Sequence, residues 1–318
     1  MSDTAFDERW GSRALVRAFV PVTETYNRTH RPHGLTHQGT WLWTSVSDEK
    51  GQQYVITREF KVEASTLALI SQLDPNSGQD SPRLYKNLYL GIIQNQPASK
   101  GAPMRVRSYP AKGSLGFSVE IEPQRFHLVE AGGEIDLRFR ALGPAMEYFC
   151  PGEWEDGLYA SEFCEVEGTV QGKPVRGFGG MDMAWGPPGI GWTQSKVYSL
   201  LEEYWVVFVN EFEDGGREYG IAVDGVGEFS VGFLVRDSVP QALGGTDIAM
   251  ERGSDGFPTR ATIPLGTDRY RFSTIARVAQ IKGQMQWASG EMVRENETRA
   301  VKRRFAWIEY FAKVSGSR

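Results

Sequence analysis

The chain has 318 residues, and its 40 acidic against 35 basic residues give a formal net charge of −5. Hydrophobic residues make up 40% and charged residues 24% of the chain, an ordinary globular composition that excludes a disordered or fibrous protein. At roughly 100–200 residues per domain, this length predicts two domains or one large one.

Strand patterns dominate the chain, and glycine-rich turns separate them. The predicted strands are 40–44, 53–60, 86–94, 104–109, 115–122, 125–130, 134–141, 159–171, 174–180, 197–212, 217–225, 228–236, 260–265, 269–276, 279–288 and 300–314. Two segments, 9–20 and 63–74, are predicted as short helices. Many strands at short spacing indicate a mostly β protein, with antiparallel sheets closed into barrels or sandwiches.

A connector at 150–157, rich in Gly, Pro and acidic residues, divides the chain. We therefore predict an N-terminal β domain at 1–155 and a C-terminal β domain at 156–318. No glycine-rich phosphate loop follows a strand and opens a helix, so a dinucleotide-binding fold has no support.

Location and partners follow from the same composition. No apolar run approaches the roughly 18 residues of a membrane span, and no signal-peptide pattern opens the chain. Two cysteines are too few for a secreted disulfide framework. We expect a cytoplasmic protein without a membrane span. Its one dense basic cluster, 299–304, lies at the entry to a strand, so we expect no nucleic-acid partner. The composition leaves open whether the chain forms a homodimer.

Aromatic residues make up 12% of the chain, and two predicted strands indicate where they lie. Strand 204–212 is apolar on both faces, so it is expected inside a sandwich or between domains. In strand 300–314, Trp307 and Glu309 share one face and Tyr310 lies on the other. A Glu on an aromatic face is typical of a sheet edge or of a cavity.

The segment 177–192 is the most unusual stretch, because glycines surround one acid and two tryptophans. Asp182, between two methionines and close to Trp185, is expected to be partly desolvated. Desolvation raises the pKa of a carboxyl group and suits it to general acid or base work. The alternative is that Asp182 caps a turn while Trp185 and Trp192 fill the core.

This segment resembles the lipocalin-like superfamily of carotenoid and hydroxyneurosporene hydratases, which includes the AttH-like proteins and the fungal decalin-forming Diels–Alderases. The relatives carry Asp-His-Ser-Trp-Gly where this chain has Asp182-Met183-Ala184-Trp185-Gly186, so the Asp, Trp and Gly match and the His and Ser are replaced. The resemblance implies two lipocalin-like domains packed together, a hydrophobic ligand site in or between them, and no cofactor.

Three further candidates come from outside this segment. His37 precedes an aromatic strand, and with an ordinary pKa it could act as acid or base there. Glu153 and Tyr159 bracket the connector, where residues often line clefts, although a solvated Glu is the simpler reading. His30, His33 and His37 could together hold a metal ion, but Pro32 and Gly34 argue against the helix that this spacing needs.

We predict a cofactor-independent lyase, hydratase or isomerase that acts by acid–base chemistry on a hydrophobic small molecule such as a terpenoid, a polyketide or a lignin-type aromatic. The catalytic candidates are Asp182, His37, Glu153 and Tyr159. The predicted substrate-binding residues are Trp41, Trp43, Trp185, Trp192, Tyr204, Phe208, Trp307 and Tyr310. The alternative functions are a non-catalytic carrier or sensor of an apolar ligand and a metal-dependent enzyme built on the His loop.

Overall fold

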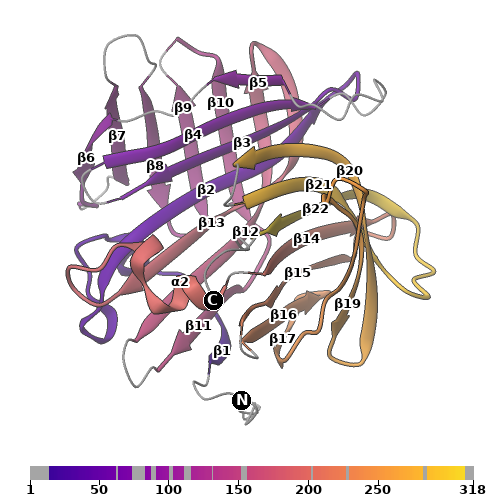
Figure 1. Ribbon diagram of the computed structural model, residues 1–318. Coiled ribbons are helices and arrows are strands. Elements are labelled where there is room, and N and C mark those ends of the chain that lie inside the picture. The colour runs from indigo at the N-terminus through magenta and orange to yellow at the C-terminus, as the bar shows by residue number, and fades with distance from the viewer. Residues whose placement is uncertain are drawn as a thin grey trace.

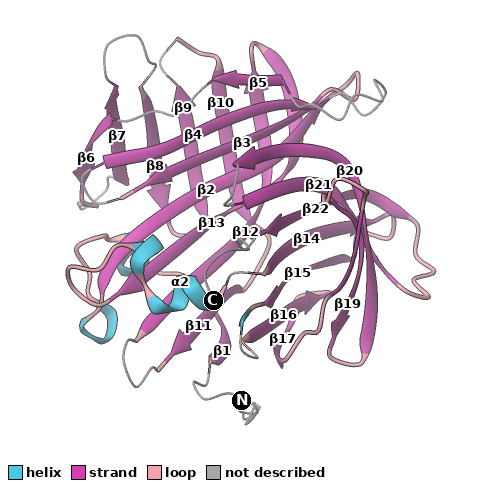
Figure 2. Cartoon of the chain, viewed as in Figure 1, coloured by secondary structure: helices cyan, strands magenta, loops and turns pink. Residues whose placement is uncertain are grey.

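The computed structural model describes residues 14–61, 64–73, 83–86, 91–99, 103–110, 116–130, 132–151, 156–201, 203–226, 229–281 and 285–311. Strands make up most of them, and both α-helices, α1 (Thr23–Tyr26) and α2 (Lys196–Leu200), are short (Figure 2). Two 3-10 turns, η1 (Pro32–Gly34) and η2 (Trp192–Gln194), also lie in this part of the chain. No helix in this part of the chain has the length and apolar character that a bilayer crossing needs.

The larger sheet holds thirteen strands, which lie between residues 15 and 186 (Figure 1). They are β1 (Leu15–Phe19), β2 (Thr36–Asp48), β3 (Gln53–Phe60), β4 (Ala64–Leu73), β5 (Arg83–Lys86), β6 (Gly91–Gln96), β7 (Met104–Pro110), β8 (Phe117–Glu122), β9 (Arg125–Glu130), β10 (Ile135–Ala141), β11 (Ala145–Cys150), β12 (Gly157–Val170) and β13 (Lys173–Gly186). Their order is β1-β11-β12-β10-β9-β8-β7-β6-β4-β3-β2-β13, with β5 beside β4. Because β12 also pairs with β13, the path from β12 to β13 closes on itself like a barrel.

The smaller sheet holds nine strands and curls against the first (Figure 1). They are β14 (Tyr204–Phe212), β15 (Arg217–Asp224), β16 (Ser230–Arg236), β17 (Val239–Gly244), β18 (Ala249–Arg252), β19 (Pro258–Leu265), β20 (Asp268–Ile281), β21 (Met285–Arg294) and β22 (Val301–Tyr310). Their order is β17-β16-β15-β14-β22-β21-β20-β19-β18. The predicted mostly β fold of two packed, curled antiparallel sheets is confirmed.

Alternation along the central strands distributes their side chains among three apolar cores. On β13, Met181 and Met183 pack inside the larger sheet, whereas Ala184 packs in the core between the sheets. On β14, Trp205 faces the core between the sheets and Phe208 lies inside the curl of the smaller sheet. Every residue of β14 is buried, so the expectation drawn from its two apolar faces is confirmed.

Ion pairs also join the two sheets. Arg303 on β22 contacts Glu165 on β12 at 2.6 Å and lies over the ring of Phe178 on β13. The other members of the basic cluster pair with acids as well: Arg299 with Glu297, Lys302 with Glu211 and Arg304 with Glu291. These acids offset the charge of the cluster that the sequence places at the start of this strand.

Two predicted helices are wrong. Residues 64–73 form β4, and residues 15–19 form β1, while the rest of 9–20 lies largely outside the described residues. Pairing with β3 and with β11 supplies hydrogen bonds that local helix preference cannot match. The chain changes sheet between β13 and β14, later than residue 156; the division into domains at 155 stays a prediction.

Candidate functional site

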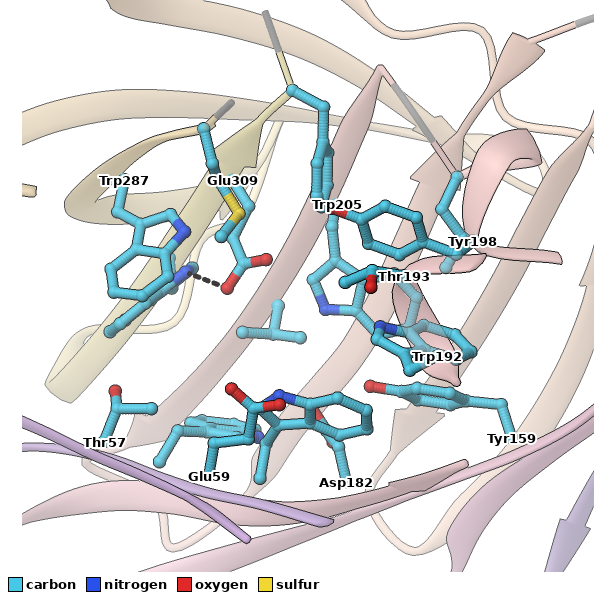
Figure 3. Close-up of a pocket in the computed structure, with 17 residues that line it drawn as sticks. Thr57, Glu59, Tyr159, Asp182, Trp192, Thr193, Tyr198, Trp205, Trp287 and Glu309 are labelled. Carbon is cyan, nitrogen blue, oxygen red and sulfur yellow. Dashed lines mark hydrogen bonds between the residues drawn. The ribbon is translucent and has the colours of Figure 1, made fainter. Parts of the chain in front are cut away.

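An aromatic cavity of about 280 Å³ lies between the two sheets (Figure 3). This volume is close to the lower end of the range for small-molecule sites. Its described lining contains six tryptophans, two tyrosines and three acids: Trp41, Trp43, Trp192, Trp205, Trp287, Trp307, Tyr159, Tyr198, Glu59, Asp182 and Glu309. Thr57, Thr193, Leu201, Val207, Met285 and Phe311 complete it.

The larger sheet contributes one cross-strand row to the cavity. Trp41 on β2 lies directly opposite Glu59 on β3 on one side and opposite Asp182 on β13 on the other. Asp182 in turn lies opposite Ser161 on β12. Since residues in direct register point to the same face of a sheet, the row places an indole between two carboxyl groups.

The smaller sheet contributes the complementary row. Glu309 on β22 lies opposite Trp287 on β21 and opposite Trp205 on β14. Here a carboxyl group stands between two indoles, and Figure 3 shows this row facing Glu59 and Asp182 across the cavity. Both rows are built from strands that are paired on each side, so their carboxyl and indole groups stand on well-supported strands.

The connection between β13 and β14 closes a third side. Trp192 in η2 packs against Trp41 and Tyr159, with ring centroids 5.4 and 5.9 Å away. Tyr198 in α2 meets Trp192 edge-on at 5.6 Å. The backbone N–H of Tyr198 donates to the Ser195 hydroxyl, which caps the short helix and fixes its start.

Asp182 is 6% exposed, and burial raises the pKa of its carboxyl group to about 6. Interactions with Ser161, Trp43 and Tyr159 lower the pKa and offset part of that rise. The Ser161 hydroxyl donates to Asp182 Oδ1 at 2.6 Å. At neutral pH Asp182 is therefore mainly ionised while its pKa stays close enough to 7 for proton transfer.

Glu309 differs from Asp182 in its protonation state at neutral pH. Burial and then the negative charge of Asp182 raise its pKa to about 8, although the hydrogen bond from Trp307 lowers the pKa. That bond runs from Trp307 Nε1 to Glu309 Oε1 at 3.1 Å. Glu309 therefore keeps its proton at neutral pH, so the cavity sets a carboxylic acid, Glu309, against the carboxylate of Asp182.

Tyr159 links this site to the core behind it. Burial and the charge of Asp182 raise the pKa of Tyr159 well above its ordinary value, so its hydroxyl stays protonated. Its ring stacks on Tyr148 at 5.3 Å and meets Trp205 edge-on at 5.0 Å. The packed ring holds the hydroxyl beside Asp182, where it can orient the carboxylate or a substrate oxygen.

The structure brings six of the predicted site residues to the cavity: Asp182, Tyr159, Trp41, Trp43, Trp192 and Trp307. It places Tyr204 and Phe208 in the core inside the smaller sheet, with Tyr310 packed against that core. Trp185 lies inside the larger sheet. Glu153 lies outside the described residues.

His37 also lies away from the cavity. Burial and then the charge of Arg28 lower the pKa of His37 to about 3, so it is neutral at pH 7 and differs from the ordinary imidazole that the sequence led us to expect. Its Nε2 hydrogen-bonds with the Thr40 hydroxyl at 2.8 Å, and its ring meets Trp185 edge-on. Within the described residues, no group of three His, Cys, Asp or Glu side chains could hold a metal ion.

Sequence reasoning missed Glu59, Trp205 and Trp287 as parts of the site. Glu59 has a signal in sequence, because it interrupts the apolar pattern of strand 53–60, but only the register with β2 shows that it points to the cavity. The sequence does mark Glu309, as the one acid on an aromatic strand face, which is typical of a sheet edge or of a cavity. In the structure Glu309 lines the cavity.

No protein-family model matches the sequence, and no curated protein matches it either. Solved structures of distantly similar fold include the following two. One, from Nitrosomonas europaea and named provisionally as an AttH, has a TM-score of 0.49 and 10% identity and covers 86% of this chain and 92% of its own. The other, kievitone hydratase from Nectria haematococca, has a TM-score of 0.42 and 10% identity and covers 87% of this chain and 90% of its own. Neither likeness assigns an activity to this chain.

Proposed function

We propose that the chain is an enzyme that performs acid–base chemistry on a hydrophobic small molecule in the cavity between the sheets. The observation that carries the proposal is the pair of carboxyl groups, Asp182 and Glu309, that line one cavity from opposite sheets with raised pKa values of about 6 and about 8. Two groups whose pKa values are separated by their surroundings are suited to act as base and acid.

The pair accounts for dehydration and its reverse, hydration. In dehydration the Asp182 carboxylate takes a proton from carbon as the C=C bond forms, and Glu309 gives its proton to the leaving hydroxyl, which departs as water. Hydration reverses these steps in the form of the protein that has Asp182 protonated and Glu309 ionised: Glu309 takes a proton from water as the water oxygen bonds to carbon, and Asp182 gives its proton to the neighbouring carbon. An isomerisation uses the same groups, because Asp182 removes a proton from one carbon and Glu309 returns one to another. The scheme includes no cofactor.

The tryptophan side chains that line the cavity determine the polarity around the reacting atoms. Indole rings line three sides of the cavity, and such apolar walls lower the local dielectric constant, which strengthens the interaction of the carboxyl groups with the reacting atoms. Their faces also favour positive charge that develops on a substrate. Tyr159, beside Asp182, acts as a positioning residue for the carboxylate.

The test uses purified protein with a panel of small hydrophobic alcohols and alkenes in D₂O. Proton transfer at carbon leaves deuterium in the recovered molecule, which mass spectrometry detects even where substrate and product interconvert. We expect Asp182→Asn and Glu309→Gln each to lower exchange by about 10²-fold or more. Glu251→Gln changes an exposed acid of the smaller sheet and should leave the exchange unchanged.

The alternative is a carrier or sensor, which needs the same aromatic cavity but not the two carboxyl groups. Tryptophan fluorescence reports binding, because six indoles line the site. Suppose that a ligand quenches this fluorescence equally in the native protein and in Asp182→Asn, and that it takes up no deuterium. That result would show that the protein is a carrier or sensor and not an enzyme.

A further inference from the structure

Trp307 and Glu309 form a bonded pair within one strand of the smaller sheet. They are two residues apart on β22, so both side chains project from the same face, toward the cavity that both line. The Trp307 indole N–H donates to Glu309 Oε1 at 3.1 Å, and it is the one hydrogen bond that the described residues make to this carboxyl group. Contact between substrate and the Trp307 ring leaves this N–H without a role, so the pair needs its own explanation.

The ring that carries the donor is held in place. Trp307 is buried, and its ring centroid lies 5.6 Å from that of Trp287 on β21. Along this stretch β22 pairs with β14 on one side and with β21 on the other. Packing and strand pairing therefore fix the direction in which the N–H points.

The bond decides which oxygen of Glu309 carries the proton. A protonated carboxyl group has one O–H and one carbonyl oxygen, whereas an indole N–H is a donor only. Since Oε1 accepts from Trp307, it is the carbonyl oxygen, and the proton lies on Oε2. Figure 3 shows the bond ending on one oxygen of Glu309, while the other oxygen points away from it.

Among the described residues, no other neighbour of Glu309 duplicates this contact. The residues opposite Glu309 on the adjacent strands are Trp205 and Trp287, and the buried Nε1 of Trp287 has no hydrogen-bond partner. The other titratable side chains of the cavity lining come from the larger sheet and from α2: Glu59, Asp182, Tyr159 and Tyr198. Of these, Asp182 acts on Glu309 through its charge, which does not select one oxygen of the carboxyl group.

We infer that Trp307 is a positioning residue for the acid: its indole N–H occupies Oε1 of Glu309, keeps the transferable proton on Oε2, and stabilises the carboxylate that remains after transfer. The inference rests on the proposed function, because it assigns a task in the same acid–base step. In dehydration the proton passes from Oε2 to the leaving hydroxyl, the C–O bond breaks and water departs, while Asp182 holds the proton taken from carbon. A hydrogen bond to a carboxylate is stronger than one to a neutral acid, so the N–H favours the transfer.

The test removes the N–H and keeps the ring. 3-Benzothienylalanine at position 307 has sulfur where the indole has N–H, and Trp307→Phe removes the donor with a smaller ring. Infrared difference spectra follow the C=O band of protonated Glu309, which is identified by its absence in Glu309→Gln. In both proteins we expect the band to move to higher wavenumber and the pKa of Glu309 to rise above about 8, because the lost bond lowers that pKa.

Trp287→Phe is the matched control for the spectra. Trp287 lines the same side of the cavity, but its Nε1 makes no hydrogen bond that the variant could lose. The C=O band of Glu309 should therefore not move to higher wavenumber in this variant. If it moves as far as in Trp307→Phe, the band reports a change of packing, and the inference falls.

Kinetics then test the task in the reaction. On the first molecule that exchanges deuterium, loss of the Trp307 N–H should lower kcat about tenfold, leave KM within about twofold and move the basic limb of the pH profile to higher pH. An unchanged band, or a loss confined to KM, overturns the inference. Because the spectra need no substrate, an unchanged band beside normal exchange overturns this inference alone, whereas absence of exchange with every molecule overturns the proposed activity whatever the band does.

Discussion

Asp182 and Glu309 belong to different sheets and line the same cavity, and the charge of Asp182 is one of the causes that raise the pKa of Glu309. Their titrations are therefore coupled: when Asp182 loses its proton, Glu309 holds its own more firmly. The packing of one sheet on the other thus brings Asp182 and Glu309 to one cavity, because the larger sheet contributes only the first and the smaller sheet only the second.

The first prediction is a bell-shaped dependence of kcat/KM on pH. The base must be ionised, which requires a pH above about 6, and the acid must hold its proton, which requires a pH below about 8. Activity should therefore be greatest near pH 7 and fall on both sides. Rates measured from pH 4 to 10 on the first molecule that exchanges deuterium check this, and a rate that keeps rising above pH 9 would remove Glu309 from the acid role.

The second prediction concerns the hydroxyl groups beside Asp182. Ser161→Ala and Tyr159→Phe each remove an interaction that lowers the pKa of Asp182, so each variant should move the acidic limb of the profile to higher pH. The basic limb should stay closer to its original position. Tyr219→Phe is the matched control, because the Tyr219 hydroxyl donates to the carbonyl of Pro144. An acidic limb that stays in place in both test variants would contradict the assigned contacts.

The sequence predicts the fold class because alternation and turns are local properties. Strand 204–212 shows two apolar faces, and the structure buries both. The same alternation sends neighbouring side chains of one strand to opposite faces. Asp182 and Trp185 are three residues apart, so they point to opposite faces of β13, and of these two only Asp182 reaches the cavity. Grouping the two as one site overlooked that alternation.

The rest of the site depends on contacts that no local pattern contains. The sequence divides Tyr204 and Trp205 between two faces but does not say which face meets the other sheet. Glu59 reaches the site through the register of β3 with β2, and Glu309 meets Asp182 only because two sheets pack together. Register and packing are properties of the whole fold, so these residues appear as a group only in three dimensions.

A third prediction concerns stability inside the larger sheet. Burial raises the pKa of Glu162 from 4.5 to about 7, although Tyr26 donates a hydrogen bond of 2.7 Å to it and lowers that pKa. The folded protein binds this proton more tightly than the unfolded chain, so stability is greatest below pH 4.5 and falls as the pH rises to 7. Glu162→Gln removes this loss, because an amide keeps an oxygen acceptor without the charge.

Urea unfolding at pH 4.5 and pH 8 measures the effect. The variant should match the native protein at pH 4.5 and exceed its unfolding free energy by up to about 3 kcal/mol at pH 8. Glu251→Gln should show no such difference between the two pH values. A variant that is less stable at pH 8 would show that the ionised carboxylate is stabilised in the barrel rather than strained by burial.

A fourth prediction tests why the strand that carries Asp182 is rich in glycine. A Cβ atom on Gly180 would lie 2.3 Å from the carbonyl oxygen of Glu162 and 2.5 Å from Cζ2 of Trp43. Backbone cannot yield easily there, so Gly180→Ala must displace β12 or the Trp43 indole that lines the cavity. We expect a loss of about 1–3 kcal/mol in unfolding free energy and weaker quenching of tryptophan fluorescence by those alcohols and alkenes of the panel that quench it in the native protein.

The matched variant for this test is Gly191→Ala. Gly191 has an extended backbone, and the nearest atom to an added Cβ is the flexible Gln194 side chain at 3.5 Å. Its unfolding free energy should therefore stay within about 0.5 kcal/mol of the native value. If Gly180→Ala proves as harmless as Gly191→Ala, the close approach of β12, β13 and Trp43 does not define the cavity wall, and the glycines of this strand serve its turns and flexibility instead.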